Sequence, residues 1–122
     1  MAQPAKILKW MHHGTLLQCN AGSFMGYFGS HVKKMAELLL YNHMVTFIGS
    51  DGHNTTSRNT NLHKTEQTII QLDHGRTDTV TACAHNAAKI LQNKSIYPVL
   101  PEQWEEPRHN FLSSVLHTFS LT

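Results

Sequence analysis

Apolar residues recur along this chain with two alternating periods, which together predict its secondary structure. Apolar positions three or four residues apart predict amphipathic helices, and short apolar runs between polar turns predict strands. The pattern predicts helices over about 4–13, 30–40, 61–73 and 78–92, and strands over 15–20 and 44–49. The order α-β-α-β-α-α alternates helices with strands, as in parallel sheets with crossover helices. The chain is therefore expected to have an α/β fold.

Two of the predicted helices have distinct apolar faces. The helix over 30–40, with Ser30 as its expected N-cap, has the clearest periodicity. The helix over 78–92 carries a continuous stripe of mostly small residues that is expected to pack closely. The two faces consist of Val32, Met35, Ala36, Leu39 and Leu40, and of Val80, Cys83, Ala84, Ala87, Ala88 and Leu91. The run at 44–49 is nearly continuously apolar, which is typical of a central parallel strand covered on both faces.

Length and composition limit the architecture and the partners. The chain has 122 residues, of which 40% are hydrophobic and 15% are charged. This fits one folded domain, and it falls short of the roughly 250 residues of a complete α/β barrel. We expect a domain over 1–97, followed by a proline- and glutamate-rich linker and tail over 98–122 with a possible last helix at 111–119. The net charge of +2 comes from scattered basic residues, which argues against a nucleic-acid partner.

The termini, hydropathy and cysteines indicate the compartment. The N-terminus does not start a signal peptide, and no apolar run approaches the ~18 residues of a membrane span. Cys19 and Cys83 are far apart in sequence and fit buried small hydrophobic residues of a reducing compartment, although a disulfide between them stays open. We therefore expect a cytoplasmic protein without membrane insertion.

The candidate chemistry follows the second predicted strand. Asp51 and His53 are two residues apart, and in an extended segment their side chains point the same way. A carboxylate and an imidazole can together bind Mn²⁺ or Zn²⁺. Arg58, in the same loop, offers paired donors that match phosphate oxygens. The alternatives are an ordinary Asp51-Gly52 turn and a solvated arginine.

A glycine-punctuated segment at 21–29 precedes the helix over 30–40 and is expected to be a loop. Its spacing matches neither a Walker motif nor GxGxxG. Its aromatic residues Phe24, Tyr27 and Phe28 are expected to be exposed; they could line a substrate cleft, but a hydrophobic plug over the core is the favoured interpretation. Most of the ten histidines are expected at the surface, because they fall at predicted helix ends, on polar faces or in the tail.

Four stretches together resemble the C-terminal half of the bacterial PHP-domain protein-tyrosine phosphatases. They are LLQCNAGS at 16–23, GYFG at 26–29, VTFIGSDGHN at 45–54 and SR at 57–58, with a weaker match at NAAKIL over 86–91. These enzymes are manganese-dependent and regulate capsule and exopolysaccharide synthesis. The resemblance covers about residues 5–97, and its combination of SDxHN with SR is the most specific part.

The resemblance implies a function and a fold. The fold would be the C-terminal part of a distorted (β/α) PHP barrel with metal ions at the strand ends. Asp51 and His53 would be metal ligands, with manganese the expected metal and iron or zinc possible. Arg58 would be the catalytic residue that binds the substrate phosphate. The substrate would be phosphotyrosine on a partner tyrosine kinase.

The chain also departs from this family. The family's N-terminal His-x-His, its middle acidic and histidine ligands and its His-Pro-Glu-Arg segment have no counterpart here. The isolated chain is therefore expected to be incomplete, and to pair with a missing N-terminal half or with a second copy, or to fold around its own tail. Two alternatives remain open: another PHP phosphoesterase acting on a small phosphate ester, and a non-catalytic remnant with a binding or scaffold role.

Overall fold

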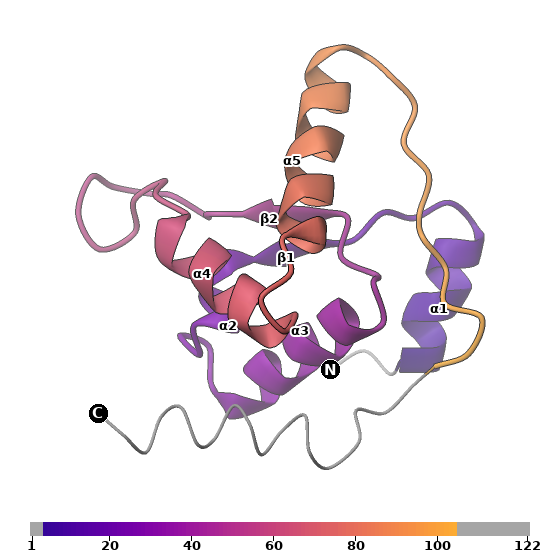
Figure 1. Cartoon of the computed structure of the whole chain (residues 1–122), viewed down its shortest axis with the longest axis horizontal. Helices are drawn as coiled ribbons and strands as arrows, with labels where there is room; N and C mark the ends of the chain where they lie inside the picture. Colours follow the sequence, from indigo (N-terminus) through magenta and orange to yellow (C-terminus); the bar gives the residue numbers. More distant parts are fainter. Residues whose placement is uncertain (1–3, 105–122) are drawn as a thin grey trace.

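A computed structural model of the chain describes residues 4–104 and shows a two-stranded sheet surrounded by helices (Figure 1). The elements of the described residues are α1 (Pro4–His12), β1 (Gln18–Asn20), α2 (Ala21–Phe24), α3 (Ser30–Tyr41), β2 (Phe47–Gly49), α4 (His63–Leu72) and α5 (Asp78–Leu91). The predicted helix at 111–119, and the cover that we expected from the tail, lie outside the described residues. Among residues 4–104, no helix combines the length and the apolar character that crossing a bilayer requires.

The two strands are parallel, as the sequence predicts, and Gln18, Cys19 and Asn20 pair with residues 47–49. Each strand has three residues and is therefore shorter than predicted. Regular pairing gives way at Thr46 and Leu17. The Leu17 carbonyl accepts from the backbone N–H groups of both Thr46 and Phe47 at 2.9 and 3.1 Å, while the Leu17 N–H donates to the Thr46 hydroxyl at 3.3 Å.

The segment between the strands differs from the prediction. Residues 21–24 form the one-turn helix α2, which we expected to be loop. The Asn20 side chain caps this helix by accepting a hydrogen bond from the Gly22 N–H at 2.9 Å, which is the usual role of asparagine at an N-cap. Ser30 is the first residue of α3, and Gly29, at φ 94°, occupies the cap position expected for Ser30.

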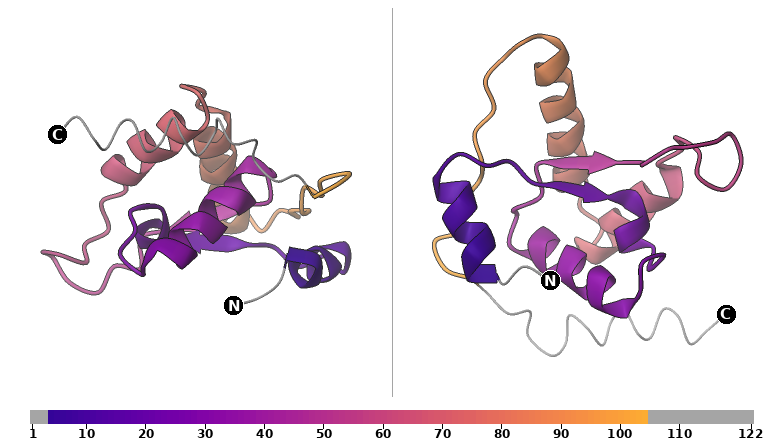
Figure 2. Two further views of the ribbon diagram at one scale, coloured as in Figure 1. Left: turned by 90° about the horizontal axis from the view of Figure 1, so that it is seen from below. Right: turned by 180° about the vertical axis from the view of Figure 1, so that it is seen from behind.

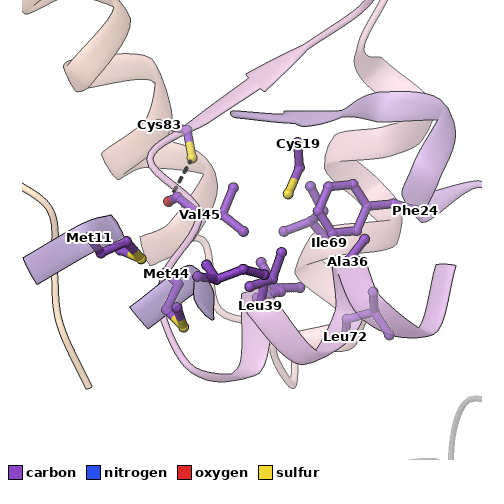
Figure 3. Close-up of a cluster of buried hydrophobic side chains, with 12 residues drawn as sticks. Met11, Cys19, Phe24, Ala36, Leu39, Met44, Val45, Ile69, Leu72 and Cys83 are labelled. Carbon is purple, nitrogen blue, oxygen red and sulfur yellow. Dashed lines mark hydrogen bonds between the residues drawn. The ribbon is translucent and has the colours of Figure 1, made fainter. Parts of the chain in front are cut away.

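The hydrophobic core lies between the sheet and helices α3 and α4 (Figure 3). Helices α2 and α4 pack together on this side of the sheet. The largest completely buried side chains are Met11, Phe24, Met44 and Ile69. Cys19 and Cys83 are both buried and both free, which fits the interpretation of these residues as small hydrophobic residues.

Helix α5 packs against β2 and α4, and much of its surface is uncovered (Figures 1 and 2). Two contacts tie it to the segment that leads into β2. The Cys83 thiol lies 3.7 Å from the Val45 carbonyl oxygen, and the Asn86 amide donates to the Thr46 carbonyl at 3.1 Å. Within α5, Cys83 is the one buried residue.

The predicted close packing of the α5 stripe is therefore wrong for most of its length. Ala84, Ala87, Ala88 and Leu91 are exposed and Val80 is half-buried. The prediction that β2 is covered on both faces is also wrong, because its three residues are only half-buried. The described residues contain two strands of a sheet and do not close into a barrel.

Candidate functional site

The candidate site is built on the loop that leaves the carboxyl end of β2 (Figure 1). Residues 51–61 of this loop are exposed. Asp51 begins the loop with φ 53°, in the left-handed region, which aspartate tolerates better than most residues. The extended backbone on which we based the pairing of Asp51 with His53 is therefore wrong. A tight turn brings the two side chains together instead.

Asn54 holds the loop closed. Its side-chain oxygen accepts hydrogen bonds from the Thr56 N–H at 3.0 Å, the Thr56 hydroxyl at 3.2 Å and the Arg58 N–H at 2.9 Å. In return, the Arg58 carbonyl accepts from the backbone N–H groups of His53 and Asn54 at 2.7 and 3.1 Å. Asparagine side chains commonly organise turns in this way. The loop thus fixes the backbone positions of His53 and Arg58 relative to each other.

Arg58 and Asp51 form an ion pair. The Arg58 Nη2 lies 2.6 Å from the Asp51 Oδ2. This hydrogen bond, followed by one from Asn20 and by the nearby His53, lowers the pKa of Asp51. The carboxylate is consequently ionised at neutral pH, as a metal ligand must be. Asn20 reaches this corner from the end of β1, next to β2 in the sheet.

His53 is oriented by the same turn. Its Nδ1 lies 2.5 Å from the Asp51 carbonyl oxygen and 3.6 Å from the Asp51 Oδ1. A carbonyl oxygen can only accept, so Nδ1 is the donor and the lone pair of the neutral ring is on Nε2. Metal-binding histidines are typically held in this way, with the second ring nitrogen bonded to a backbone carbonyl.

The donor set fits a divalent cation in chemistry but is incomplete in number. A carboxylate oxygen and an imidazole nitrogen suit Mn²⁺, Fe²⁺ or Zn²⁺. Catalytic metal sites generally use at least three protein ligands. Residues 4–104 contain no group of three or more histidine, cysteine, aspartate or glutamate side chains that could hold a metal ion. Asp51 and His53 are therefore one corner of a possible site.

A cleft with a volume of about 300 Å³ lies beside this corner. Asp51 and Arg58 line it, whereas His53 does not. The other lining residues are Asn20, Ala21, Gly22, Met25, Tyr27, Phe28, Ser50, Thr56, Ser57, Asn59, Asn61, Lys64 and Thr65. The walls of the cleft are thus formed by the ends of both strands, by α2 and the turn after it, by the loop after β2 and by the first turn of α4.

The structure separates the three aromatic residues of the segment at 21–29. The prediction that Phe24 is exposed is wrong, because it is completely buried in the core. Tyr27 and Phe28 are exposed, as expected, and line the cleft. Lys64 and Asn20 are cleft residues that the sequence reasoning did not single out. The position of Asn20 as the last residue of a strand was a usable signal, because the carboxyl ends of parallel strands meet at one edge.

The comparisons with known proteins agree with this picture. The family model for capsular polysaccharide synthesis, CpsB/CapC, matches residues 1–92. The tyrosine-protein phosphatase YwqE of Bacillus subtilis is 25% identical over 99 residues, which is 81% of this chain and 38% of that protein. A solved structure from work on YwqE of Bacillus subtilis and CpsB of Streptococcus pneumoniae, described as unique metal-dependent tyrosine phosphatases, is also similar. It superposes with a TM-score of 0.70 at 23% identity, over 84% of this chain and 41% of that one.

The fold therefore places the chain among mixed helix–sheet proteins similar to this solved phosphatase structure. The chain belongs to the capsular polysaccharide synthesis CpsB/CapC family. It spans about two fifths of the length of the relatives that it matches.

Proposed function

We propose that this chain supplies the metal- and phosphate-binding corner of a metal-dependent protein-tyrosine phosphatase. The observation that carries the proposal is the gathering of Asp51, His53 and Arg58 at the end of β2. The carboxylate is ionised, the imidazole presents Nε2, and the guanidinium lies beside a cleft. Membership of the CpsB/CapC family and the similarity to YwqE support the choice of reaction.

The roles follow from the chemistry of each group. Asp51 and His53 would bind a divalent metal, with manganese our first expectation and iron or zinc next. Such a metal, when bound, would neutralise charge on the phosphoryl group and make a bound water more acidic. Arg58 would bind the phosphate through its paired N–H groups. We propose that the remaining ligands come from another polypeptide segment or from a second copy of the chain.

The proposed substrate is a phosphotyrosine side chain on a partner protein. The similar proteins are described as tyrosine phosphatases. The family resemblance in the sequence suggests that the partner is a bacterial tyrosine kinase of capsule or exopolysaccharide synthesis. Buried free thiols at Cys19 and Cys83 support a reducing compartment, and we place the protein in the cytoplasm.

The test is to purify the whole chain, measure bound manganese, iron and zinc, and follow hydrolysis of a phosphotyrosine peptide with added Mn²⁺. We expect Asp51→Asn and His53→Ala to lose metal and turnover. We expect Arg58→Ala to keep its metal and to lose about 10- to 100-fold in kcat/KM, the effect of one charged hydrogen-bonding group.

The chain offers a matched control in the ion pair of Arg76 with Asp78. This pair is also exposed and also has an N–O separation of 2.6 Å, but it does not line the cleft. Asp78→Asn and Arg76→Ala should therefore leave metal content and turnover unchanged. Absence of stoichiometric metal and of turnover would overturn catalysis by this chain on its own or as a homo-oligomer, and would favour a non-catalytic binding role. Faster hydrolysis of small alkyl phosphates would favour another PHP phosphoesterase.

A further inference from the structure

Two exposed aromatic rings beside the cleft call for an explanation. Tyr27 is 70% exposed and Phe28 is 51% exposed, although large apolar rings generally gain free energy by leaving water. Both belong to the turn after α2, and the backbone holds them there. The Tyr27 N–H donates to the Gly22 carbonyl at 2.9 Å, and the Gly29 N–H donates to the Gly26 carbonyl at 3.2 Å.

Both rings pack against Gly22. A Cβ atom at this position would lie 2.9 Å from Phe28 Cε2 and 3.1 Å from Tyr27 Cδ2. Any side chain at Gly22 would therefore push the rings away, so the absence of a Cβ sets their position. Because Gly22 also bonds to the Asn20 side chain, the rings rest on the same backbone that leads to the Asp51 corner.

The cleft combines these rings with two cationic side chains. Arg58 enters from the loop, and Lys64 enters from the first turn of α4. The volume of about 300 Å³ lies at the lower end of the range for small-molecule sites. A cleft with cationic groups and aromatic rings among its walls suits a ligand that is both anionic and aromatic.

We propose that Tyr27 and Phe28 form an aromatic wall that contacts the ring of an aryl phosphate, while Lys64 binds its phosphate together with Arg58. This inference rests on the proposed function and extends it, because it names the residues that select phosphotyrosine over alkyl phosphates. Arg58 and Lys64 recognise the phosphate of any ester. The aromatic wall distinguishes the esters, because an aliphatic phosphoserine leaves the rings in water.

The test is a set of binding titrations of the whole chain, monitored by NMR. The probes are phosphotyrosine, phosphoserine and inorganic phosphate. We expect phosphotyrosine to bind about three- to tenfold more tightly than phosphoserine, as one aromatic pair contributes. Replacing both rings with leucine, Tyr27→Leu with Phe28→Leu, should bring this ratio close to one without changing the affinity for inorganic phosphate. Lys64→Gln should weaken all three probes by about the same factor.

Further variants separate a specific wall from a general effect. Gly22→Ala should lower the ratio, because its Cβ displaces the rings. If that variant does not fold, the leucine variants still decide, since they change exposed side chains. Tyr97→Leu is the matched control, because Tyr97 is an exposed tyrosine that does not line this cleft, and it should preserve the ratio.

The results can separate the inference from the proposed function. An equal affinity for phosphotyrosine and phosphoserine in the unaltered chain would overturn the aromatic wall, and so would a ratio unchanged by the leucine variants. Absence of phosphotyrosine binding would overturn it as well. If the unaltered chain binds no metal and has no turnover but still prefers phosphotyrosine to phosphoserine, the proposed phosphatase function is refuted and the aryl phosphate site is retained.

Discussion

Comparing the loss of stability caused by one buried and one exposed apolar residue on neighbouring helices will test whether the core ends before the stripe of α5. Ile69 on α4 is completely buried, with an exposed fraction of 0%, whereas Leu91 at the end of α5 is 89% exposed. The two substitutions are Ile69→Ala and Leu91→Ala. Alanine is the best helix former, so the loss of packing decides the difference between the two variants.

The structure sets the expected magnitudes. Truncation of a buried isoleucine removes its transfer free energy and leaves a cavity, at a cost of about 2–5 kcal/mol. For Leu91, only about a tenth of the roughly 1.5–3 kcal/mol available from burying a leucine is realised, or about 0.2–0.3 kcal/mol. Urea denaturation followed by far-ultraviolet circular dichroism gives both values as shifts of the midpoint at constant slope.

A cost above about 1 kcal/mol for Leu91→Ala would refute the uncovered position of the α5 stripe, because exposed substitutions usually stay within ~0.5 kcal/mol. Repeating the titrations at several protein concentrations identifies the cause. A cost that grows with concentration would mean that a second copy covers the stripe, as we expect if the chain forms a homo-oligomer. A cost independent of concentration would mean that the chain itself covers it.

Three further predictions concern polar groups that are buried or half-buried. Burial raises the pKa of both Cys19 and Cys83 to about 11 from an ordinary value of 9.0, so iodoacetamide at pH 8 should label them about 100-fold more slowly than unfolded chain; equal rates would contradict this. Burial also raises the pKa of Glu37, whose Oε1 is buried without a hydrogen-bond partner among the described residues. The folded state then binds the Glu37 proton more tightly than the unfolded state does. The free energy of unfolding should therefore fall as pH rises above the ordinary glutamate pKa of 4.5. Glu37→Gln should flatten that profile in urea titrations between pH 4 and 7. Asn86→Ala removes the bond to Thr46 and should cost about 1 kcal/mol in the same assay.

The long helices could be predicted from the sequence because their apolar residues recur at helical spacing. Helix α2 could not, since one turn is too short to show a period, and it depends on the cap from Asn20. The stripe on α5 shows the limit of such patterns. Periodicity identifies the apolar face of a helix, but only the arrangement of the whole chain decides whether Leu91 is covered.

The site could be predicted in part. The order of residues placed Asp51, His53 and Arg58 in one loop after a strand. The ion pair between Asp51 and Arg58 could not be read from that order, because it depends on the left-handed turn at Asp51 and on the bonds of Asn54. Lys64 was missed because it reaches the cleft only where α4 packs against α2.

The hydrogen bonds within the loop after β2 are local in sequence, and this has a consequence for folding. The bonds that join Asp51, His53, Asn54 and Arg58 span at most seven residues. Contacts of short range cost little loop-closure entropy and can form early in folding. The corner formed by Asp51, His53 and Arg58 should therefore assemble early in folding, before any other segment that completes the site is in place.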